Sequence, residues 1–459
     1  MSPLQVQKQG QSLRSPNGRP GSPFEPLIDP RFGLIRSLEP APLPAEMPRR
    51  LHRAHALCSD AQRFSPWTSD RESGGFAWDD PAAARAAAAG EAVERYCGNL
   101  VPEGLRRGSW RDLRASGDAA VDPDELALFS AAQYAQPGFP FVPMGRDLPM
   151  LWAAGESLVD GSPVWVPASL VWVTFFFGAP TAGEPRTHPT PYAGIATGGT
   201  RERAEVSAML EILERDAMSV AWHRGDPLPE LEVPGFVTHR VRAESVSMRF
   251  FEIPSELGAA VVGALAYDEA QDIPVLGLAC RPEPAAAALK AAAEAFQLLL
   301  TCRILADPTS SYMQRVAAGA EGLGVKPWRA DRAYRSSYRN DWRDAWDLLC
   351  HLQIHLDPAM REPLAARLRG AVGKRLEDLP TLTGGRRELV DHFVSRGYRP
   401  VCVDVTTPDV AASGLSVVRV VIPGLYGNAP AAFPYLGGAR LAAAQGGVKE
   451  PFLMPPPWG

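Results

Sequence analysis

Two distant segments of the chain repeat one short pattern, Glu-x-x-Glu-Arg, and each lies in a stretch that favours helix. The first is residues 91–95, EAVER, in an alanine-rich run that begins at Pro81 after two aspartates. The second is residues 211–215, EILER, in a run from Thr200 to His223 with apolar residues at helical spacing. Glutamates at i and i+3 share one helix face. Two such helices packed together would gather four carboxylates, an arrangement that requires cations between them.

The chemistry of such a cluster points to magnesium and phosphate. Oxygen ligands suit Mg²⁺, which in turn chelates polyphosphates, and the adjacent arginines can bind phosphate oxygens. A second interpretation is that each pattern only stabilises an exposed helix. The second pattern, however, lies in the apolar stretch MLEILERDAM, where an exposed helix would carry a wider polar face. A later helix adds Lys290 and Glu294, which by spacing alone form an i, i+4 ion pair.

Helices and strands alternate over most of the length, which predicts an α/β or α+β fold. Helices are predicted at 81–100, 126–134, 200–223 and 283–304, with two or three more within 342–400. Strands are predicted at 164–177, within 249–267, and at 273–280, 400–405 and 416–422, whereas 307–345 is polar and irregular. Residues 1–25 carry few large apolar groups, so we expect a flexible N-terminal tail. The proline-dense end, PFLMPPPWG, is expected to be extended.

Composition narrows the classes of function. Lys and Arg number 47 against 52 Asp and Glu, a net charge of −5, so the basic excess of a general nucleic-acid binder is missing. The first 23 residues hold no apolar signal segment, and uncharged apolar stretches fall short of the ~20 residues that span a bilayer. We therefore expect a cytoplasmic protein that binds neither nucleic acid nor membrane. The six cysteines are scattered without a Cys-x-x-Cys pair, as is typical of reduced, buried thiols.

Conventional nucleotide and nucleophile motifs are missing from the sequence. Residues 370–374, GAVGK, are too short for a phosphate-binding loop and are followed by Arg375 rather than Ser or Thr. Neither Gly-x-Gly-x-x-Gly nor Gly-x-Ser-x-Gly occurs. A nucleotide would therefore need an unconventional site.

Taken in order, several segments resemble the YcaO family, ATP-dependent enzymes that modify peptide backbones. The resemblance spans roughly residues 27–459. The segments that carry it are LIDPRFGLIRSL, SGGFAWDDPAAARAAAAGEAVERYCGN, LFSAAQYAQPGFPFVPM, WVPASLVWV, GIATGGTRERAEVSAMLEILERDA, ALKAAAEAFQ and VVIPGLYGNAPAAFPYLGGARL, with the proline-rich end. Within the family the chain most resembles the stand-alone cyclodehydratases of thiazole- and oxazole-modified peptide pathways.

The resemblance implies a composite fold of helices packed on mixed sheets, with a site for ATP and Mg²⁺ between the E-x-x-E-R helices. The residues that match the family's metal- and phosphate-site glutamates are Glu91, Glu94, Glu211 and Glu214. The further residues implied to contact ATP are Arg215, Lys290 and Glu294. The implied reaction begins when a Cys, Ser or Thr side chain attacks the preceding amide carbonyl. ATP then phosphorylates the oxyanion, and phosphate leaves to give an azoline. The tail is implied to reach this site, with Pro457 and the carboxylate of Gly459 as catalytic groups.

The chain departs from the family at one segment of the implied site. Members usually read N-G-x-A-x-G-N-T-x-x-E-A before the second E-x-x-E-R, whereas this chain reads AGIATGGTRERA over residues 193–204. Ala193 and Gly199 replace asparagines, and Arg203 replaces a glutamate. We hypothesise that Arg203 pairs with an ATP phosphate and replaces part of a metal ion's charge. The tail also departs, because Pro455, Pro456 and Pro457 are adjacent rather than alternating with other residues.

The resemblance also implies partners and a division of the chain. The expected substrate is a ribosomal precursor peptide, with a separate leader-peptide-binding protein, an azoline dehydrogenase that uses flavin, and a homo- or hetero-oligomeric assembly. We expect a tail at 1–25, a catalytic domain at 26–450 and a proline-rich tail at 451–459. Two alternatives stay open: formation of a thioamide or amidine by the same backbone activation, and a non-catalytic scaffold that docks substrate and partner.

Overall fold

The structure is a computed structural model that describes residues 22–458, apart from 64–65, 67–69, 383 and 445–449. Three antiparallel sheets form its framework. The first has the order β1 (Ile35–Pro40), β2 (Leu51–Cys58), β3 (Glu72–Trp78), and the second the order β11 (Ile273–Cys280), β10 (Val261–Asp268), β9 (Val246–Glu252). The third has the order β4 (Arg106–Gly108), β5 (Met150–Ser157), β13 (Val401–Asp404), β14 (Ser416–Val421), β7 (Ile195–Gly198), and β6 (Pro163–Pro167) also pairs with β5.

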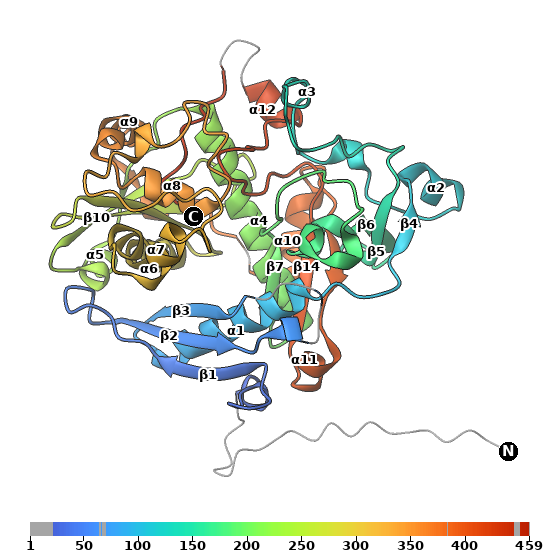
Figure 1. Ribbon diagram of the computed structural model, residues 1–459, viewed down its shortest axis with the longest axis horizontal. Coiled ribbons are helices and arrows are strands. Elements are labelled where there is room, and N and C mark those ends of the chain that lie inside the picture. Colours follow the sequence, from blue (N-terminus) through green and yellow to red (C-terminus); the bar gives the residue numbers. More distant parts are fainter. Residues whose placement is uncertain (1–21, 64–65, 67–69, 383, 445–449, 459) are drawn as a thin grey trace.

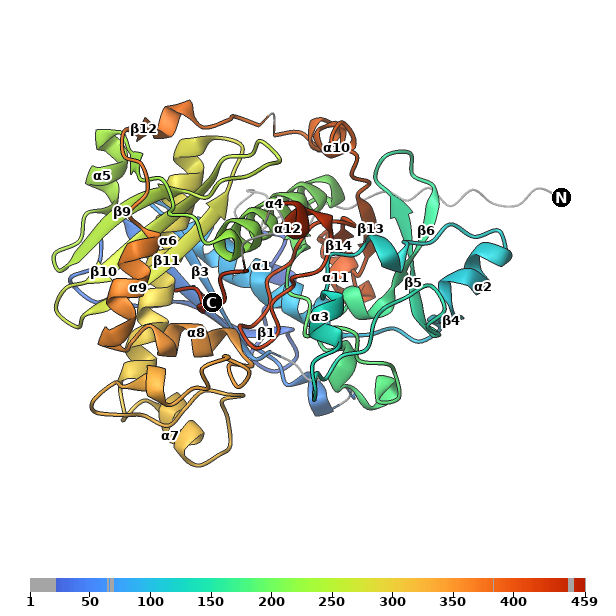
Figure 2. The ribbon, with the colours of Figure 1, turned by 90° about the horizontal axis from the view of Figure 1, so that it is seen from above.

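Three long helices, α1 (Pro81–Asn99), α4 (Arg201–Arg224) and α6 (Pro284–Ala306), cover these sheets. α1 packs on β3, α6 packs on β11, and α4 lies between β7 and β14 on one side and β11 on the other. Figures 1 and 2 show α4 near the centre of the molecule, with α1 close to it and the β9–β11 unit to one side. The expected architecture of helices on mixed sheets is confirmed.

Small residues let α1 and α6 lie very close to their strands. A Cβ atom on Gly75 of β3 would stand 2.1 Å from the carbonyl oxygen of Ala84 in α1. A Cβ atom on Gly277 of β11 would stand 2.2 Å from the carbonyl oxygen of Ala291 in α6. Both helices turn alanine-rich faces to the sheet, so their backbones approach the strands more closely than larger side chains would allow.

The ends of these helices follow from their capping residues. The Asp80 carboxylate accepts hydrogen bonds from the N–H groups of Ala82 and Ala83, and Pro81 occupies the first helical position. α4 begins after Thr200, whose hydroxyl accepts from the Arg203 N–H, and ends at Gly225, which has φ +76°. The predicted boundaries of both helices are therefore confirmed to within one residue.

The other elements are shorter and surround this framework. The remaining helices are α2 (Trp110–Ala115), α3 (Ala131–Tyr134), α5 (Gly235–Val241), α7 (Ser311–Ala317), α8 (Leu348–Ile354), α9 (Arg361–Arg367), α10 (Arg386–Val394), α11 (Pro408–Ala412) and α12 (Ala439–Ala444). The strands β8 (Leu231–Glu232) and β12 (Lys374–Arg375) form a small parallel pair. The six cysteines are all buried and unpaired, as predicted.

Three predictions of secondary structure are wrong. Residues 307–345, predicted to be irregular, include the helix α7 (Ser311–Ala317). The apolar run at 164–177 is a strand only as far as Pro167; beyond it the chain makes two 3₁₀ turns, at 168–170 and 175–177. The run is apolar because its residues pack in the core beneath α1, not because it continues in a sheet. The predicted helix at 126–134 is helical only from Ala131, after the 3₁₀ turn Pro123–Glu125.

Two further expectations concern single segments. Among the described helices α6 alone is long and apolar enough, by length and composition, to cross a membrane. Half of that stretch is buried in the protein, on the sheet that contains β11, so we interpret it as a core helix. The predicted flexible tail at 1–25 falls mostly on residues 1–21, which lie outside the described residues, and Glu25–Leu27 form a 3₁₀ turn.

Candidate functional site

The structure brings the two E-x-x-E-R patterns together and gives them matching surroundings. The first glutamate of each accepts a hydrogen bond from a glycine N–H seventeen residues upstream: Gly74 to Glu91 at 3.1 Å, and Gly194 to Glu211 at 3.1 Å. The arginine of each pattern lies one turn further on, with Arg95 at 3.7 Å from Glu91 and Arg215 at 3.8 Å from Glu211. The repeated sequence pattern therefore corresponds to a repeated contact in the structure: an upstream glycine N–H binds the first glutamate of each helix pattern.

The second glutamate of each pattern lies in surroundings that disfavour its charged form. Burial, and then the nearby Glu211, raise the pKa of Glu94 to about 8. Burial also raises the pKa of Glu214 to about 7, with Arg215 opposing this shift and Glu294 adding to it. One oxygen of Glu214 accepts from the N–H of Cys280 in β11 at 3.0 Å. These carboxyls gain a proton easily in the absence of a cation.

The helix α6 contributes the other two predicted residues. Lys290 and Glu294 form an ion pair at 3.0 Å, and Glu294 is close enough to influence the pKa of both Glu214 and Arg215. All seven residues predicted to contact the cofactor therefore line one region, where α1, α4 and α6 come together.

An arginine that sequence reasoning missed organises the neighbouring loop. Arg419 in β14 is fully buried and donates hydrogen bonds to the backbone carbonyls of Val171, Pro191, Tyr192 and Ala193. Burial lowers its pKa to about 10, while Glu211 and then Glu94 favour its charged form. The sequence did carry a signal, because an arginine inside the apolar strand SVVRVV needs buried partners. Arg281 was also missed, and it lies near Glu214.

The residues at this site fit Mg²⁺ that arrives with a nucleotide. Glu214 is buried and Glu94 is half-buried, and burial together with nearby carboxylates raises the pKa of both carboxyls. The Nε atom of Arg215 is buried and makes no hydrogen bond to the protein, although it lies 3.8 Å from a Glu211 oxygen. Among the residues that the structure describes, no three His, Cys, Asp or Glu side chains are grouped to hold a metal by themselves. Mg²⁺ commonly takes one or two carboxylates and completes its shell with water and substrate phosphates.

In the segment that departs from the family pattern, several residues make contacts that stabilise the structure. The Gly194 carbonyl accepts from the Val420 N–H at 2.7 Å, which fixes the loop that also holds Glu211. Glu205 is buried and bridges Arg201, at 2.8 Å, and Arg386, so both of its oxygens are engaged away from the E-x-x-E-R residues. Arg203 is exposed, on the turns of α4 that precede Glu211.

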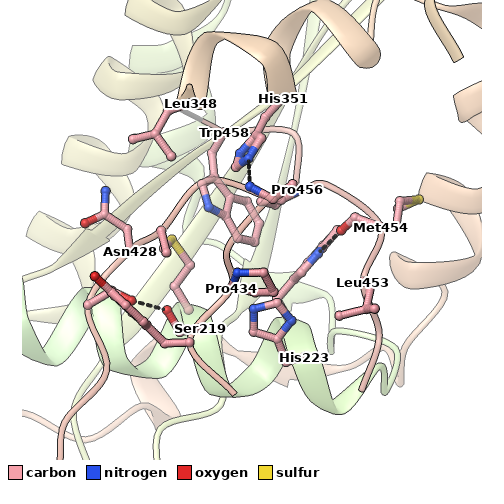
Figure 3. A pocket seen from close by; sticks show the side chains of 16 residues that line it. Ser219, His223, Leu348, His351, Asn428, Pro434, Leu453, Met454, Pro456 and Trp458 are labelled. Carbon is pink, nitrogen blue, oxygen red and sulfur yellow. Dashed lines mark hydrogen bonds between the residues drawn. The ribbon is translucent and has the colours of Figure 1, made fainter. Parts of the chain in front are cut away.

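The C-terminal tail lies in a groove between α4, β11 and α8. Trp458 packs edge-on against Trp222, with ring centroids 4.7 Å apart, and the Trp222 indole donates to the Met454 carbonyl at 2.7 Å. Figure 3 shows the tail passing between α4, which carries Ser219 and His223, and α8, which carries His351. Beyond the labelled residues, His355 donates to the Pro455 carbonyl at 2.8 Å.

The end of the tail lies along the same strand edge that binds Glu214. The Pro457 carbonyl accepts from the Leu276 N–H at 2.9 Å, and Cys280, four residues along β11, donates to Glu214. Four residues of strand span about 13 Å. The predicted catalytic residue Gly459 lies outside the described residues. The tail therefore contacts β11 at Leu276, on the same strand whose Cys280 binds Glu214.

Comparison with known proteins agrees with this arrangement. The family model described as YcaO cyclodehydratase, ATP- and Mg²⁺-binding, matches residues 79–426. The chain is 24% identical over 365 residues to an uncharacterized protein in the tfuA 3′ region of Rhizobium leguminosarum bv. trifolii, a match that covers 75% of each chain. It is 26% identical over 226 residues to an uncharacterized protein of Methanothermobacter thermautotrophicus, covering 47% of this chain and 54% of that one.

Solved structures share the fold at low sequence identity. A heterocyclase in complex with substrate and cofactor aligns with a TM-score of 0.59 and 19% identity over 93% of this chain, which spans only 55% of the heterocyclase. YcaO from Methanopyrus kandleri, bound with AMPPCP and Mg²⁺, aligns with a TM-score of 0.53 and 21% identity, covering 86% of this chain and 90% of that one. The E. coli microcin synthetase McbBCD complex aligns with a TM-score of 0.55 and 12% identity, covering 87% and 91%.

Proposed function

Because this chain belongs to the YcaO family, whose members bind ATP and Mg²⁺, we propose that it is an ATP-dependent cyclodehydratase that converts Cys, Ser or Thr of a ribosomal precursor peptide to azolines. The observation that carries the proposal is the pair of facing E-x-x-E-R helices, with Glu214 buried and Glu94 half-buried near other carboxyls. Such carboxyls are poorly suited to a purely structural role, since burying like charges together is unfavourable without a cation.

The proposed reaction activates the amide oxygen before it leaves. The substrate thiol or hydroxyl loses its proton and adds to the preceding amide carbonyl, which becomes an oxyanion. The oxyanion attacks the γ-phosphorus of ATP and ADP departs. Expulsion of phosphate, with loss of the amide proton, then forms the C=N bond of the azoline. Bound Mg²⁺ would supply charge neutralisation for phosphoryl transfer.

Each group of site residues has a proposed task in this reaction. Glu91, Glu94, Glu211 and Glu214 would hold Mg²⁺ directly or through water. Arg215, whose buried Nε makes no hydrogen bond to the protein, would bind a phosphate oxygen. Lys290 and Glu294 would complete the nucleotide site from α6. We propose that residues 26–450 act as one catalytic unit and that Pro457 and Gly459, at the end of the tail, act beside the reacting amide.

Partners are also part of the proposal. One solved relative is a heterocyclase in complex with substrate, and another is part of the McbBCD complex. We propose by analogy that this chain acts in the cytoplasm with a leader-peptide-binding protein, within a homo- or hetero-oligomer, and that an azoline dehydrogenase oxidises the product.

The test is modification of a precursor peptide by the purified chain with its leader-binding partner. Glu211→Gln and Glu214→Gln should each abolish ATP-dependent loss of water from the peptide, measured by mass spectrometry. Glu202→Gln is the matched control, since Glu202 is exposed on the same helix. Full turnover by both site variants would contradict the proposal. A product in which sulfur replaces oxygen would instead support the thioamide alternative, and peptide binding without ATP consumption would support the scaffold alternative.

A further inference from the structure

A cavity of about 660 Å³ lies beside the E-x-x-E-R site and contains none of the seven residues predicted to contact ATP. Its walls come from segments far apart in the sequence, at 138–141, 173–177, 186–192, 343–348 and 430–433. Its volume falls within the range of about 300–1,000 Å³ typical of ligand sites.

The cavity has a fixed aromatic wall and an exposed apolar rim. Phe141 packs edge-on against Phe433, with centroids 5.0 Å apart, and against Phe139 at 5.7 Å. At the rim Phe177 is 52% exposed and Trp346 is 56% exposed. Large apolar side chains left in water around one concave site are a mark of a binding surface.

The charged and titratable groups of this cavity are engaged by the protein itself. The buried His188 donates from Nδ1 to the Pro189 carbonyl at 2.6 Å and contacts the Ser169 hydroxyl at 3.0 Å. Asp347 accepts from the Leu349 N–H at 2.8 Å as the cap of α8, and Arg343 donates to Gln136. A ligand is therefore recognised here mainly by shape and apolar contact rather than by charge.

The cavity adjoins the candidate active site, because two of its lining residues contact Arg95. The ring of Tyr192 lies under the Arg95 guanidinium, 5.5 Å from the ring centroid, and Asp70 lies 3.9 Å from the same guanidinium. Tyr192 also precedes Ala193 and Gly194, the residues that fix the loop holding Glu211. An occupant of this cavity therefore has the first E-x-x-E-R helix immediately beside it.

We propose that this cavity binds an aromatic or large aliphatic side chain of the substrate peptide, within a few residues of the side chain that is cyclised. The inference rests on the proposed function and adds a sequence preference to it. The peptide is favoured over the adenine of ATP as the occupant because no residue predicted to contact ATP lines the cavity, while its exposed rim at Phe177 and Trp346 leaves room for a chain that continues beyond the bound side chain.

The experiment uses two synthetic octapeptides with one central Cys in a Gly/Ser background and a guest Phe or Ser two residues before it. Their binding to the full-length protein, with AMPPCP and Mg²⁺ present, is measured by calorimetry. The Phe peptide should bind at least fivefold more tightly than the Ser peptide. Phe177→Ser and Trp346→Ser should each reduce that ratio to below twofold, since both side chains line the rim. Phe236→Ser is the matched control, because Phe236 is 54% exposed on α5, outside this cavity.

Binding of AMPPCP with Mg²⁺ should stay within twofold of the unmodified protein in both rim variants. Equal binding of the two peptides by the unmodified protein would overturn the inference. It would also be overturned if the rim variants weakened AMPPCP binding and kept the peptide preference, a result that would assign the cavity to the nucleotide. Because this assay needs no turnover, its outcome is separate from that of the proposed reaction: a Phe preference without azoline formation would leave the cavity assignment standing.

Discussion

Arg203 stands where the family resemblance implies a glutamate, and its side chain is exposed on α4 before Glu211. An arginine cannot hold a cation but can bind phosphate. We therefore expect the chain to hold fewer divalent ions with AMPPCP than YcaO from Methanopyrus kandleri does. The bound ions are counted in both proteins by Mn²⁺ titration with electron paramagnetic resonance. Arg203→Glu should add one ion. A full complement in the unmodified protein, unchanged in the variant, would refute the compensation by Arg203.

Arg419 is the residue whose loss should harm stability most directly. Its guanidinium serves four backbone carbonyls in a fully buried position. Arg419→Met removes those donors and leaves the carbonyls without partners, so we expect a loss of about 3–5 kcal/mol in the free energy of unfolding. Urea unfolding followed by circular dichroism measures it. Arg387→Met should change stability by less than about 0.5 kcal/mol, since the Arg387 side chain is 90% exposed.

The site residues differ in how far sequence could predict them. The E-x-x-E-R glutamates were predictable because both the repeat and the helix spacing are local. Arg419 and Tyr192 were not, because their roles depend on which loop lies beside which strand, a long-range property. Even so, the charged residue inside an apolar strand was a visible signal for Arg419.

At the scale of elements, the tail and α8 form a unit that depends on neutral histidines. Burial lowers the pKa of His351 to about 3 and that of His355 to about 4, below the ordinary value of 6.5. Between the folded pKa values and 6.5, the unfolded chain binds more protons than the folded one. The free energy of unfolding is therefore highest above about pH 6.5 and falls as the pH drops toward 4. Each histidine accounts for on the order of 3 kcal/mol over this range.

The measurement for this effect is urea unfolding between pH 7.5 and 4.5, compared with His355→Gln. The amide can still donate to the Pro455 carbonyl but does not titrate. We expect the variant to lose less stability than the unmodified protein as the pH falls. Parallel pH curves for the two proteins would show that His355 is not a source of the acid sensitivity.

The tail itself should matter for catalysis beyond its packing. Its adjacent prolines at 455–457 make it stiff, so it loses little entropy on binding its groove and positions its last residues reproducibly. Deleting Pro457 to Gly459 should lower the rate of cyclisation at least tenfold, or ~1.4 kcal/mol of barrier, with precursor binding unchanged. Leu453→Ser, on an exposed part of the tail, is the control. A normal rate of cyclisation after the deletion would contradict a catalytic role, and the tail would then only pack against Trp222.

Helices with capping residues in the sequence were predicted well. Segments whose conformation depends on tertiary packing were not. α1 and α4 have caps and periodicity in the sequence, so their ends follow from it. The run at 164–177 is apolar enough for a strand, but Pro167 ends its pairing with β5 and the rest turns into the core. Apolar composition alone does not distinguish a buried strand from buried turns.

At the scale of the whole molecule, three helix–sheet units surround one polar centre. α1 on its sheet, α6 on its sheet and the central α4 each supply part of the carboxyl cluster, and β11 and β14 fix Glu214 and the loop before β7. The class and the composite architecture were predictable from the alternation of elements and the family resemblance. The order of strands in the third sheet was not, because it pairs strands far apart in the sequence, such as β5 and β13, in which Ser157 lies opposite Val401.

The most direct test of the central claim is calorimetric binding of AMPPCP to the full-length protein with and without Mg²⁺, in the unmodified form and in Glu94→Gln and Glu214→Gln. Since the Glu94 carboxyl, with its pKa raised to about 8, is largely neutral at pH 7 without a cation, its amide replacement should keep the fold, which circular dichroism checks. We expect Mg²⁺-dependent binding to the unmodified protein and to Glu202→Gln, and at least tenfold weaker binding to both site variants. Equal binding by all four proteins would show that the nucleotide site does not lie between the two E-x-x-E-R helices.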